Sequence, residues 1–265
     1  MHTGASSTLT LLPADPDAGI IFVSESGVEI PALADHVVAT NRATTLGLGA
    51  GRVQSVEHLL SALYALGVDN VRAVVAGPEV PACDGSAREW VSLIRRAGRR
   101  GLGRPRPAGA LPGPVWTGEG ESWAMAWPAH RLLVAVGVHF PETAVGRQGL
   151  WLALTGRRYT EELAPARTFA FEWELESLRA SGMARGGGAE NAFAVGQTGY
   201  SGPLRFPDEV VRHKALDLIG DLALCGRRVK AQVVAVRPSH GGNVALARAL
   251  RKALVGEAGL GCRQS

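Results

Sequence analysis

The segment Asp208 to Leu222 constrains this chain more than any other stretch, because it places an imidazole and two carboxylates at regular steps of four residues. Residues four apart lie almost above one another on a helix, so His213, Asp217 and Asp221 would share one face. The opposite face is apolar and would pack into a core; it holds Val211, Ala215, Leu218, Ile219 and Leu222. The segment therefore predicts a helix with one chemical face and one buried face.

The chemical face of this helix has the spacing of a metal site. His213 and Asp217 can both reach one metal ion, and Asp221 can act from the next turn as a partner that orients a ligand or transfers a proton. The alternative is a solvated helix face, which is what most polar pairs at this spacing are. A second stretch of the chain favours the metal site.

That second stretch, SVEHLLSALYALG, predicts another helix, with Ser55 as its candidate N-cap. A metal ion bound by His58, His213 and Asp217 would have two nitrogen ligands, one carboxylate oxygen and an open position for water. This is the ligand count of a hydrolytic zinc site. Glu57 could then accept a proton from the water. Its alternative is a first-turn acid that interacts favourably with the helix dipole.

Three further residues are candidates for roles at such a site. His240 lies in PSHGGN, predicted as a loop between a strand and a helix, where a cationic imidazole held by Asp221 could stabilise an oxyanion or protonate a leaving amine. The hydroxyl of Thr168 could help to hold an oxyanion, and Lys214 could meet a phosphate. Taken singly, such residues are more often an exposed loop histidine, an ordinary threonine and a solvated lysine.

Composition limits the class of protein. The 265 residues are 46% hydrophobic and 20% charged, which is enough for one large core or two modest ones. No apolar run reaches about 18 residues and the N-terminus has no signal-peptide pattern, so we expect a cytoplasmic protein without an integral membrane segment. Three cysteines without CxxC spacing argue against a disulfide framework, and a net charge of +4 without a basic block argues against nucleic acid as a partner.

Alternation, periodicity and turn residues predict the order of elements. Strands are expected at 8–12, 19–23, 70–76, 122–127, 131–139, 149–154, 192–195 and 229–236. Helices are expected at 55–67, 87–97, 171–181, 208–222 and 244–255.

Two regions of the chain repeat one order of elements. In each, a helix with a histidine near its start is followed by a glycine, an apolar strand, a loop and a closing helix, over 55–97 and 208–255. This order predicts an α+β fold of two similar domains from a duplicated unit, each a β-sheet layered with helices, with the site at the domain interface. The Gly- and Pro-rich segment 98–114 marks the boundary, so we expect domains over 1–103 and 104–265.

Six segments of the chain together resemble a known family. They are, in order, SVEHLLSALYALGVDN, GPEVPACDGSA, PARTFAF, GMARGGGAENAFAV, DEVVRHKALDLIGDLALCG and SHGGN. They resemble the UDP-3-O-acyl-N-acetylglucosamine deacetylases of lipid A biosynthesis, and the resemblance runs from His2 to the last helix. The pair EHLLSAL and RHKALDLIGDL carries most of the specificity.

The resemblance implies a cytoplasmic, zinc-dependent enzyme that removes acetate from a small-molecule substrate, the UDP-linked acylated amino sugar. We expect it to be a monomer. The resemblance also implies that His58, His213 and Asp217 bind Zn²⁺. The other implied site residues are Glu57 as general base, His240 supported by Asp221 as the charged partner of the oxyanion or leaving group, Thr168 near the oxyanion, and Lys214 for the substrate diphosphate.

The resemblance further implies that an inserted element, residues 169–195, forms an apolar passage for the acyl chain. Phe169 and Phe171 are candidate lining residues, with ordinary core packing as the alternative. Two alternatives for the function stay open. One is deacetylation of a different N-acyl amino sugar, and the other is a non-catalytic descendant that binds zinc or a sugar nucleotide. Glu57 beside the ligands argues against the second, because a binding protein needs no base.

Overall fold

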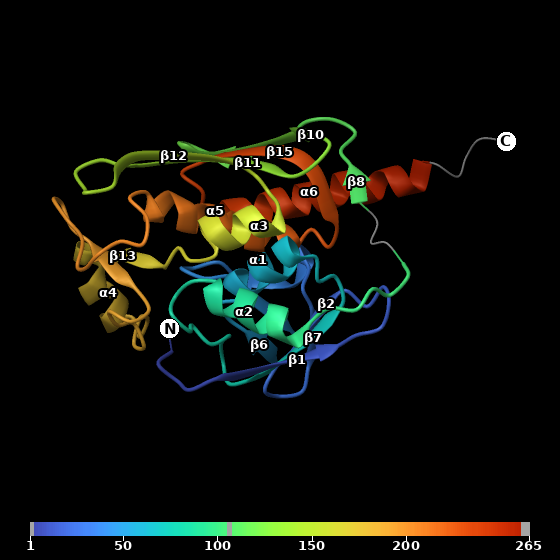
Figure 1. The fold of residues 1–265 in the computed structure, drawn as a ribbon, viewed down its shortest axis with the longest axis horizontal. Coiled ribbons are helices and arrows are strands. Elements are labelled where there is room, and N and C mark those ends of the chain that lie inside the picture. Colours follow the sequence, from blue (N-terminus) through green and yellow to red (C-terminus); the bar gives the residue numbers. More distant parts are fainter. Residues whose placement is uncertain (1–2, 105–107, 261–265) are drawn as a thin grey trace.

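Two β-sheets form opposite outer layers of the protein, and its longest helices lie between them (Figure 1). The computed structural model describes residues 3–104 and 108–260. This mixture of sheets and packed helices agrees with the predicted α+β class. None of the described helices combines the length and the apolar character that crossing a bilayer requires.

The lower sheet in Figure 1 has the strand order β1-β7-β2-β3. Its strands are β1 (Thr8–Pro13), β7 (Val71–Ala76), β2 (Ile20–Val23) and β3 (Glu29–Pro31). Strand β7 runs antiparallel to β1 and parallel to β2, and β2 runs antiparallel to β3. The helices of this half are α1 (Glu57–Leu66), α2 (Arg88–Ala97) and the short η1 (Ala34–His36).

The upper sheet has the order β12-β11-β15-β10-β9, and β8 pairs with the start of β15. Its strands are β8 (Ala108–Ala110), β9 (Val115–Glu119), β10 (Ser122–Pro128), β11 (Leu133–Phe140), β12 (Gly146–Ala153) and β15 (Arg228–Val236). Strand β15 runs antiparallel to β10 and parallel to β11, and β11 runs antiparallel to β12. Helices α5 (Glu209–Ala223) and α6 (His240–Leu260) pack on one face of this sheet.

Alternation of side chains along the strands explains why that face is covered. In β15, every second residue is buried: Val229, Ala231, Val233 and Ala235. Successive side chains of a strand point to opposite faces, so these small apolar groups all face α5 and α6. The predicted strands and helices are present, with ends that differ by a few residues.

Helices α1 and α5 pack against each other and bring the two halves of the chain together. Gly220 permits a close approach, because a Cβ atom there would lie 2.1 Å from the carbonyl oxygen of Glu57. The leucines Leu59 and Leu63 of α1 and Leu216 of α5 are fully buried. Each such side chain contributes about 1.5–3 kcal/mol to folding. The close packing of α1 against α5 therefore holds the side chains of the two helices in fixed relative positions.

Two predicted helix starts are wrong. Helix α1 begins at Glu57, because Ser55 has a left-handed φ of 61° and its hydroxyl is directed at Glu79 instead of the helix. Helix α6 begins at His240, within the predicted loop. Ser239 caps it, since the Ser239 hydroxyl accepts a hydrogen bond from the backbone N–H of Gly242 at 3.1 Å.

Several smaller elements escaped prediction. Strands β4 (Val37–Ala39), β5 (Thr45–Leu48) and β6 (Gly51–Val53) form a three-stranded sheet before α1. The turn α3 (Gly156–Arg158) leads into the single-turn π-helix η2 (Tyr159–Leu163). These segments are three to five residues long, and so short a run gives little periodicity to detect.

The segment 169–195 forms a unit of its own at one end of the molecule (Figure 1). Its elements are β13 (Phe169–Phe171), η3 (Glu172–Glu174), α4 (Leu175–Ala180) and β14 (Phe193–Val195). Strands β13 and β14 pair in parallel as a separate two-stranded sheet. The predicted helix over 171–181 corresponds to η3 and α4 together.

The predicted boundary segment 98–114 is not entirely a linker. It contains β8, and Leu111 just after β8 is buried. Residues 105–107 in the middle of the segment lie outside the described residues, as does His2, where the family resemblance begins.

Candidate active site

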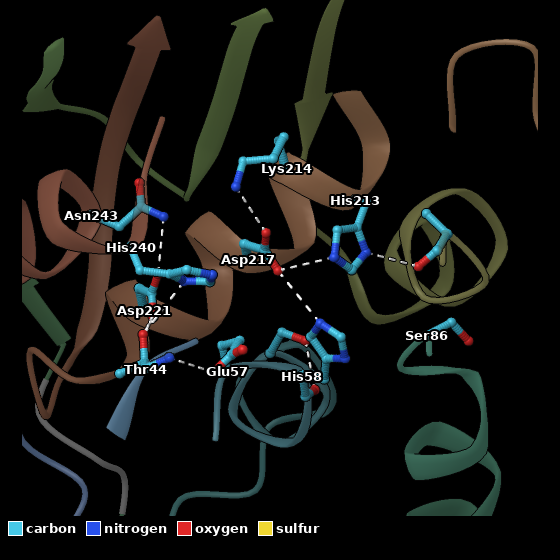
Figure 2. Close-up of polar contacts among 12 residues, drawn as sticks. Thr44, Glu57, His58, Ser86, His213, Lys214, Asp217, Asp221, His240 and Asn243 are labelled. Carbon is cyan, nitrogen blue, oxygen red and sulfur yellow. Dashed lines mark hydrogen bonds and ion pairs between the residues drawn. The ribbon is translucent and has the colours of Figure 1, made fainter. Parts of the chain in front are cut away.

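The three predicted metal ligands meet where α1 faces α5 (Figure 2). The Nε2 atoms of His58 and His213 lie 3.5 and 3.4 Å from Oδ1 of Asp217. All three ligand atoms lie within 4.8 Å of one another. Ligand atoms about 2.0–2.2 Å from a tetrahedral zinc ion are separated by roughly 3.3–3.5 Å. The spacing therefore fits a divalent metal ion.

The environment of these side chains also fits a metal ion. The Oδ1 atom of Asp217 is buried and accepts no hydrogen bond from the part of the chain that the structure describes. The Nδ1 atom of His213 donates to the carbonyl oxygen of Ala166 at 3.1 Å, which leaves Nε2 as the ligand atom. Lys214 donates from Nζ to Oδ2 of Asp217 at 3.1 Å. A buried, unpaired carboxylate oxygen between two imidazoles is a cation-binding arrangement.

The protonation of the ligands follows from burial and charge. Burial lowers the pKa of His213 to about 4, so its ring is neutral, as a ligand must be. Burial opposes ionisation of Asp217. In the acid range where Asp217 titrates, however, His213 is protonated, and its charge and that of Lys214 outweigh the effect of burial and hold the pKa of Asp217 well below its usual range. Burial also opposes charge on His58, yet its contact with Asp217 raises the pKa of His58. The cluster thus attracts positive charge.

Glu57 lies beside the ligands and is 5% exposed. Burial raises the pKa of its carboxyl group, which increases its tendency to take a proton. The backbone N–H of Thr44 donates to Oε2 of Glu57 at 3.0 Å and holds the carboxylate in place. A held carboxylate next to a metal site is positioned to accept a proton from water.

His240 reaches the site from the first turn of α6 and is held by Asp221. The Nδ1 atom of His240 lies 3.0 Å from Oδ2 of Asp221 (Figure 2). Burial lowers the pKa of His240, but the adjacent charge and hydrogen bond of Asp221 outweigh it and raise that pKa to about 9. The imidazole is therefore protonated at neutral pH, and its Nε2–H is not engaged by Asp221.

Asp221 is fully buried, and its two oxygens accept several hydrogen bonds. The Thr44 hydroxyl donates to Oδ1 at 2.6 Å, and Nδ2 of Asn243 donates to Oδ2 at 2.9 Å. Thr44 therefore joins Asp221 to Glu57, through its hydroxyl and its backbone N–H respectively. Thr44 thus couples the position of Glu57 to that of Asp221, which in turn holds His240.

One cavity of about 340 Å³ contains nearly all of the residues predicted for the site. The predicted residues that line it are Glu57, His58, Thr168, Phe169, Phe171, His213, Lys214, Asp217 and His240. Asp221 is the exception, because it lies behind His240. Arg42 and Glu174 also line the cavity and form a two-pronged ion pair, with N···O distances of 2.9 and 2.8 Å.

Aromatic rings form an apolar wall of the cavity. The rings of Phe140 and Phe171 lie 4.9 Å apart, those of Phe169 and Phe171 lie 5.7 Å apart, and Trp173 stacks on Phe171 at 4.5 Å. Phe169 also meets His213 at 6.1 Å, so the apolar wall reaches the metal ligands. The cavity is therefore polar at one side and apolar at the other.

Sequence reasoning missed Thr44, Asn243 and the carbonyl group of Ala166. Thr44 lies 13 residues before Glu57 and 177 before Asp221, so no local spacing indicates its role. Asn243 could have been found, because it follows His240 by three residues and would share a helix face with it. That inference required a helix start at His240.

A two-histidine, one-carboxylate metal site beside a buried carboxylate and a protonated imidazole defines the class of metal-dependent hydrolases that activate water. The sequence matches the UDP-3-O-acyl N-acetylglycosamine deacetylase family over residues 1–252. The chain belongs to this family and is an enzyme, a deacetylase.

Individual relatives are similar over almost the whole chain. A UDP-3-O-acyl-N-acetylglucosamine deacetylase of Thermosynechococcus vestitus is 44% identical, covering 94% of this chain and 88% of the relative. The enzyme of the same name from Anaeromyxobacter sp. (strain Fw109-5) is 43% identical over 94% of this chain and 83% of the relative. That of Chlamydia felis is 40% identical over 96% of this chain and 92% of the relative.

Proposed function

We propose that this protein hydrolyses UDP-3-O-acyl-N-acetylglucosamine to acetate and UDP-3-O-acyl-glucosamine in lipid A biosynthesis, with Zn²⁺ as its metal. The observation that carries the proposal is the convergence in one cavity of the His58, His213 and Asp217 cluster with Glu57 and a protonated His240. The ligand set of two imidazoles and one carboxylate suits zinc. A cavity used only for binding would need neither the carboxylate nor the imidazolium.

The chain's own residues divide the proton transfers. A zinc ion held by His58, His213 and Asp217 would act as a Lewis acid and would make water more acidic. Glu57 accepts a proton from the attacking water, and His240, oriented by Asp221, donates a proton to the amine nitrogen as the C–N bond breaks. Thr168 donates its hydroxyl hydrogen to the carbonyl oxygen as negative charge develops there.

The two sides of the cavity match the two ends of the substrate. Lys214 lines the polar side, where its ammonium group holds the diphosphate. Phe169 and Phe171 line the apolar side, which accepts the acyl chain within the passage formed by residues 169–195. A substrate without an acyl chain would leave this wall in contact with water, at a cost of about 25 cal/mol for each Å².

The halves of the chain are two similar domains, 1–103 and 104–265, from a duplicated unit. The strand order β1-β7-β2-β3 supports this, because β10-β15-β11-β12 repeats it with the same parallel and antiparallel pairings. Helices α1 and α5 precede the equivalent strands β7 and β15, and α2 and α6 follow them. The site then lies at the domain interface, and the enzyme works as a cytoplasmic monomer.

Acetate release by the purified enzyme, with about one zinc ion per chain, tests the assigned reaction. The substrates are UDP-3-O-acyl-N-acetylglucosamine, UDP-N-acetylglucosamine and an N-acetyl amino sugar without a nucleotide, each run beside Glu57→Ala. We expect turnover mainly of the first, and loss of turnover in the variant with zinc retained. Faster turnover of either other sugar would assign a different substrate, and no turnover despite bound zinc would indicate a binding protein.

A further inference from the structure

The face of the upper sheet that points away from α5 and α6 is apolar. Five side chains stand next to one another on adjacent strands along the row Trp116, Met125, Val234, Ala135 and Trp151. A flanking row contains Trp123, Val236 and Gly137, and the row on the other side contains Trp127, Gln232 and Leu133. We call these outward-facing residues the tryptophan face. Among the residues that the structure describes, no helix lies over this side of the sheet (Figure 1).

The exposure of the tryptophan face is unusual. Trp116 is 60% exposed and Trp151 is 58% exposed, at opposite edges of the sheet, and Trp123, Met125 and Trp127 between them are partly exposed. A sheet with one face on the core normally has polar side chains on the other. Large exposed apolar patches mark surfaces that bind proteins or membranes.

Charged residues on this face have one sign. Over positions 115–118, 122–127, 133–139, 147–153 and 230–236, the charged side chains on the outward side are those of Arg147 and Lys230, and both are exposed. His139 stands opposite Arg147 on the same face. The face therefore complements an anionic surface and repels a cationic one.

The same charges and the size of the face disfavour a second copy as its occupant. Five strands about 4.8 Å apart, each presenting about five residues at about 3.3 Å, give a projected area of roughly 400 Å². Stable dimers bury about 800 Å² on each partner. Two copies face to face would also place the positive charges of both copies in one interface, and the outward positions considered above contain no carboxylate to pair with them.

We propose that the tryptophan face is a peripheral membrane-binding surface, which lies in the head-group region of an anionic bilayer. Tryptophan is suited to that region, because its ring is apolar and its N–H is polar. Arg147 and Lys230 contribute attraction to anionic lipids. Membrane binding needs only shallow burial of the rings, so the modest area suffices.

The cavity is lined in part by residues at the ends of β11 and β15, two strands that carry this surface. His139 belongs to the tryptophan face and the following residue, Phe140, lines the cavity. Val236 belongs to the face as well, and Pro238 lines the cavity. An enzyme bound through the face would therefore hold its cavity close to the lipid surface.

Vesicle binding by the full-length protein tests the proposal. Co-sedimentation and tryptophan fluorescence would be measured with vesicles of phosphatidylcholine alone and mixed with phosphatidylglycerol. We expect binding to the anionic vesicles with a blue shift of the fluorescence. Trp116→Ser/Trp151→Ser should weaken binding at least about tenfold, because both rings lose their apolar contact. Arg147→Glu/Lys230→Glu should remove the preference for anionic vesicles.

The matched control is Leu12→Ser/Leu93→Ser, which removes two exposed apolar side chains away from the tryptophan face. It should bind vesicles like the wild type, and thermal unfolding would verify that every variant folds. Absence of vesicle binding by the wild type would overturn the proposal, as would unchanged binding of both face variants. A wild-type dimer in sedimentation velocity that is lost in Trp116→Ser/Trp151→Ser, without vesicle binding, would assign the face to self-association instead.

Discussion

The two halves of the chain have sheets of the same strand order but contribute unequally to the site. The second half supplies most of it: α5 alone carries His213, Asp217 and Asp221, at positions fixed by the helix period. The first half supplies His58 and the carboxylate of Glu57, from the first turn of α1. One half thus holds most of the candidate groups, while the position of Glu57, the proposed base, depends on how closely α1 packs against α5.

The largest expected effect concerns the two proton-transfer groups, one from each half. Glu57→Gln and His240→Gln should each lower kcat by about 10²–10⁴-fold with metal content unchanged, because each removes one transfer. If the two groups act together, kcat of the double variant should fall by a smaller factor than the product of the factors for the two single variants. A loss in only one single variant would mean that one half performs both transfers.

The link between the halves at Thr44 should have the next largest effect. Thr44→Val keeps the shape but leaves Oδ1 of Asp221 without its 2.6 Å donor, so kcat should fall by about 10- to 100-fold. KM should change little, because Thr44 is fully buried and does not line the cavity. Thr44→Ser keeps the hydroxyl and should retain most of the activity. Equal losses in the two variants would show that packing, not the hydrogen bond, matters.

The packing of the halves is tested at Gly220. Gly220→Ala should destabilise the protein by about 1–3 kcal/mol, because the new Cβ atom meets a backbone oxygen of α1 that cannot move without shifting the helix. The higher helix propensity of alanine offsets about 1 kcal/mol of a larger clash. Gly137→Ala, which meets nothing within 4 Å, is the control in chemical denaturation. Equal stability of the two variants would contradict the close approach of the helices.

The ionic contacts of Arg205 between the halves should have a smaller effect, on thermal stability in acid. Arg205 contacts Asp84 of the first half at 3.0 Å, and its backbone N–H donates to Glu209 of the second half at 2.6 Å. Burial opposes ionisation of both carboxyl groups. Hydrogen bonds from Ser86 to Asp84 and from Arg167 to Glu209 outweigh this effect. The pKa values of Asp84 and Glu209 are therefore lowered.

Both folded-state pKa values thus lie below the unfolded values of about 3.9 and 4.3. The stabilisation is complete above those unfolded values and is lost as the pH falls through the folded ones. Thermal unfolding from pH 7 to pH 3 should therefore show a decline in Tm that is shallower in Glu209→Gln. An equally steep decline in this variant would place the acid sensitivity elsewhere.

The parts of the site within one element were predictable from the sequence. The four-residue spacing on α5 predicted which face His213, Asp217 and Asp221 share. His58 and Glu57 were proposed as ligand and base because they begin a second predicted helix, and the resemblance implied the same roles. Thr44 was not predictable, because its contacts reach 13 and 177 residues along the chain and depend on helix packing. The start of α6 was wrong because two glycines after His240 suggested a loop, whereas Ser239 caps a helix there.

Which side of a strand is buried could likewise not be predicted where both sides are apolar. The segment Ser122 to Trp127 alternates small and large apolar residues, so it predicts a strand, but alternation within an apolar run does not tell which side is buried. The small side chains Ala124 and Ala126 face the helices, and the tryptophans face outward. Only the packing of α6 against the sheet decides this.

The most direct test of the account is the metal content of His58→Ala and His213→Ala, measured by elemental analysis beside the wild type. A metal site shared between α1 and α5 predicts about one zinc ion per wild-type chain, with affinity reduced at least about 100-fold in each variant, because each removes a ligand and even a supporting contact is worth 10- to 100-fold. Wild-type affinity in His58→Ala would contradict the account, since the second half would then hold the metal alone.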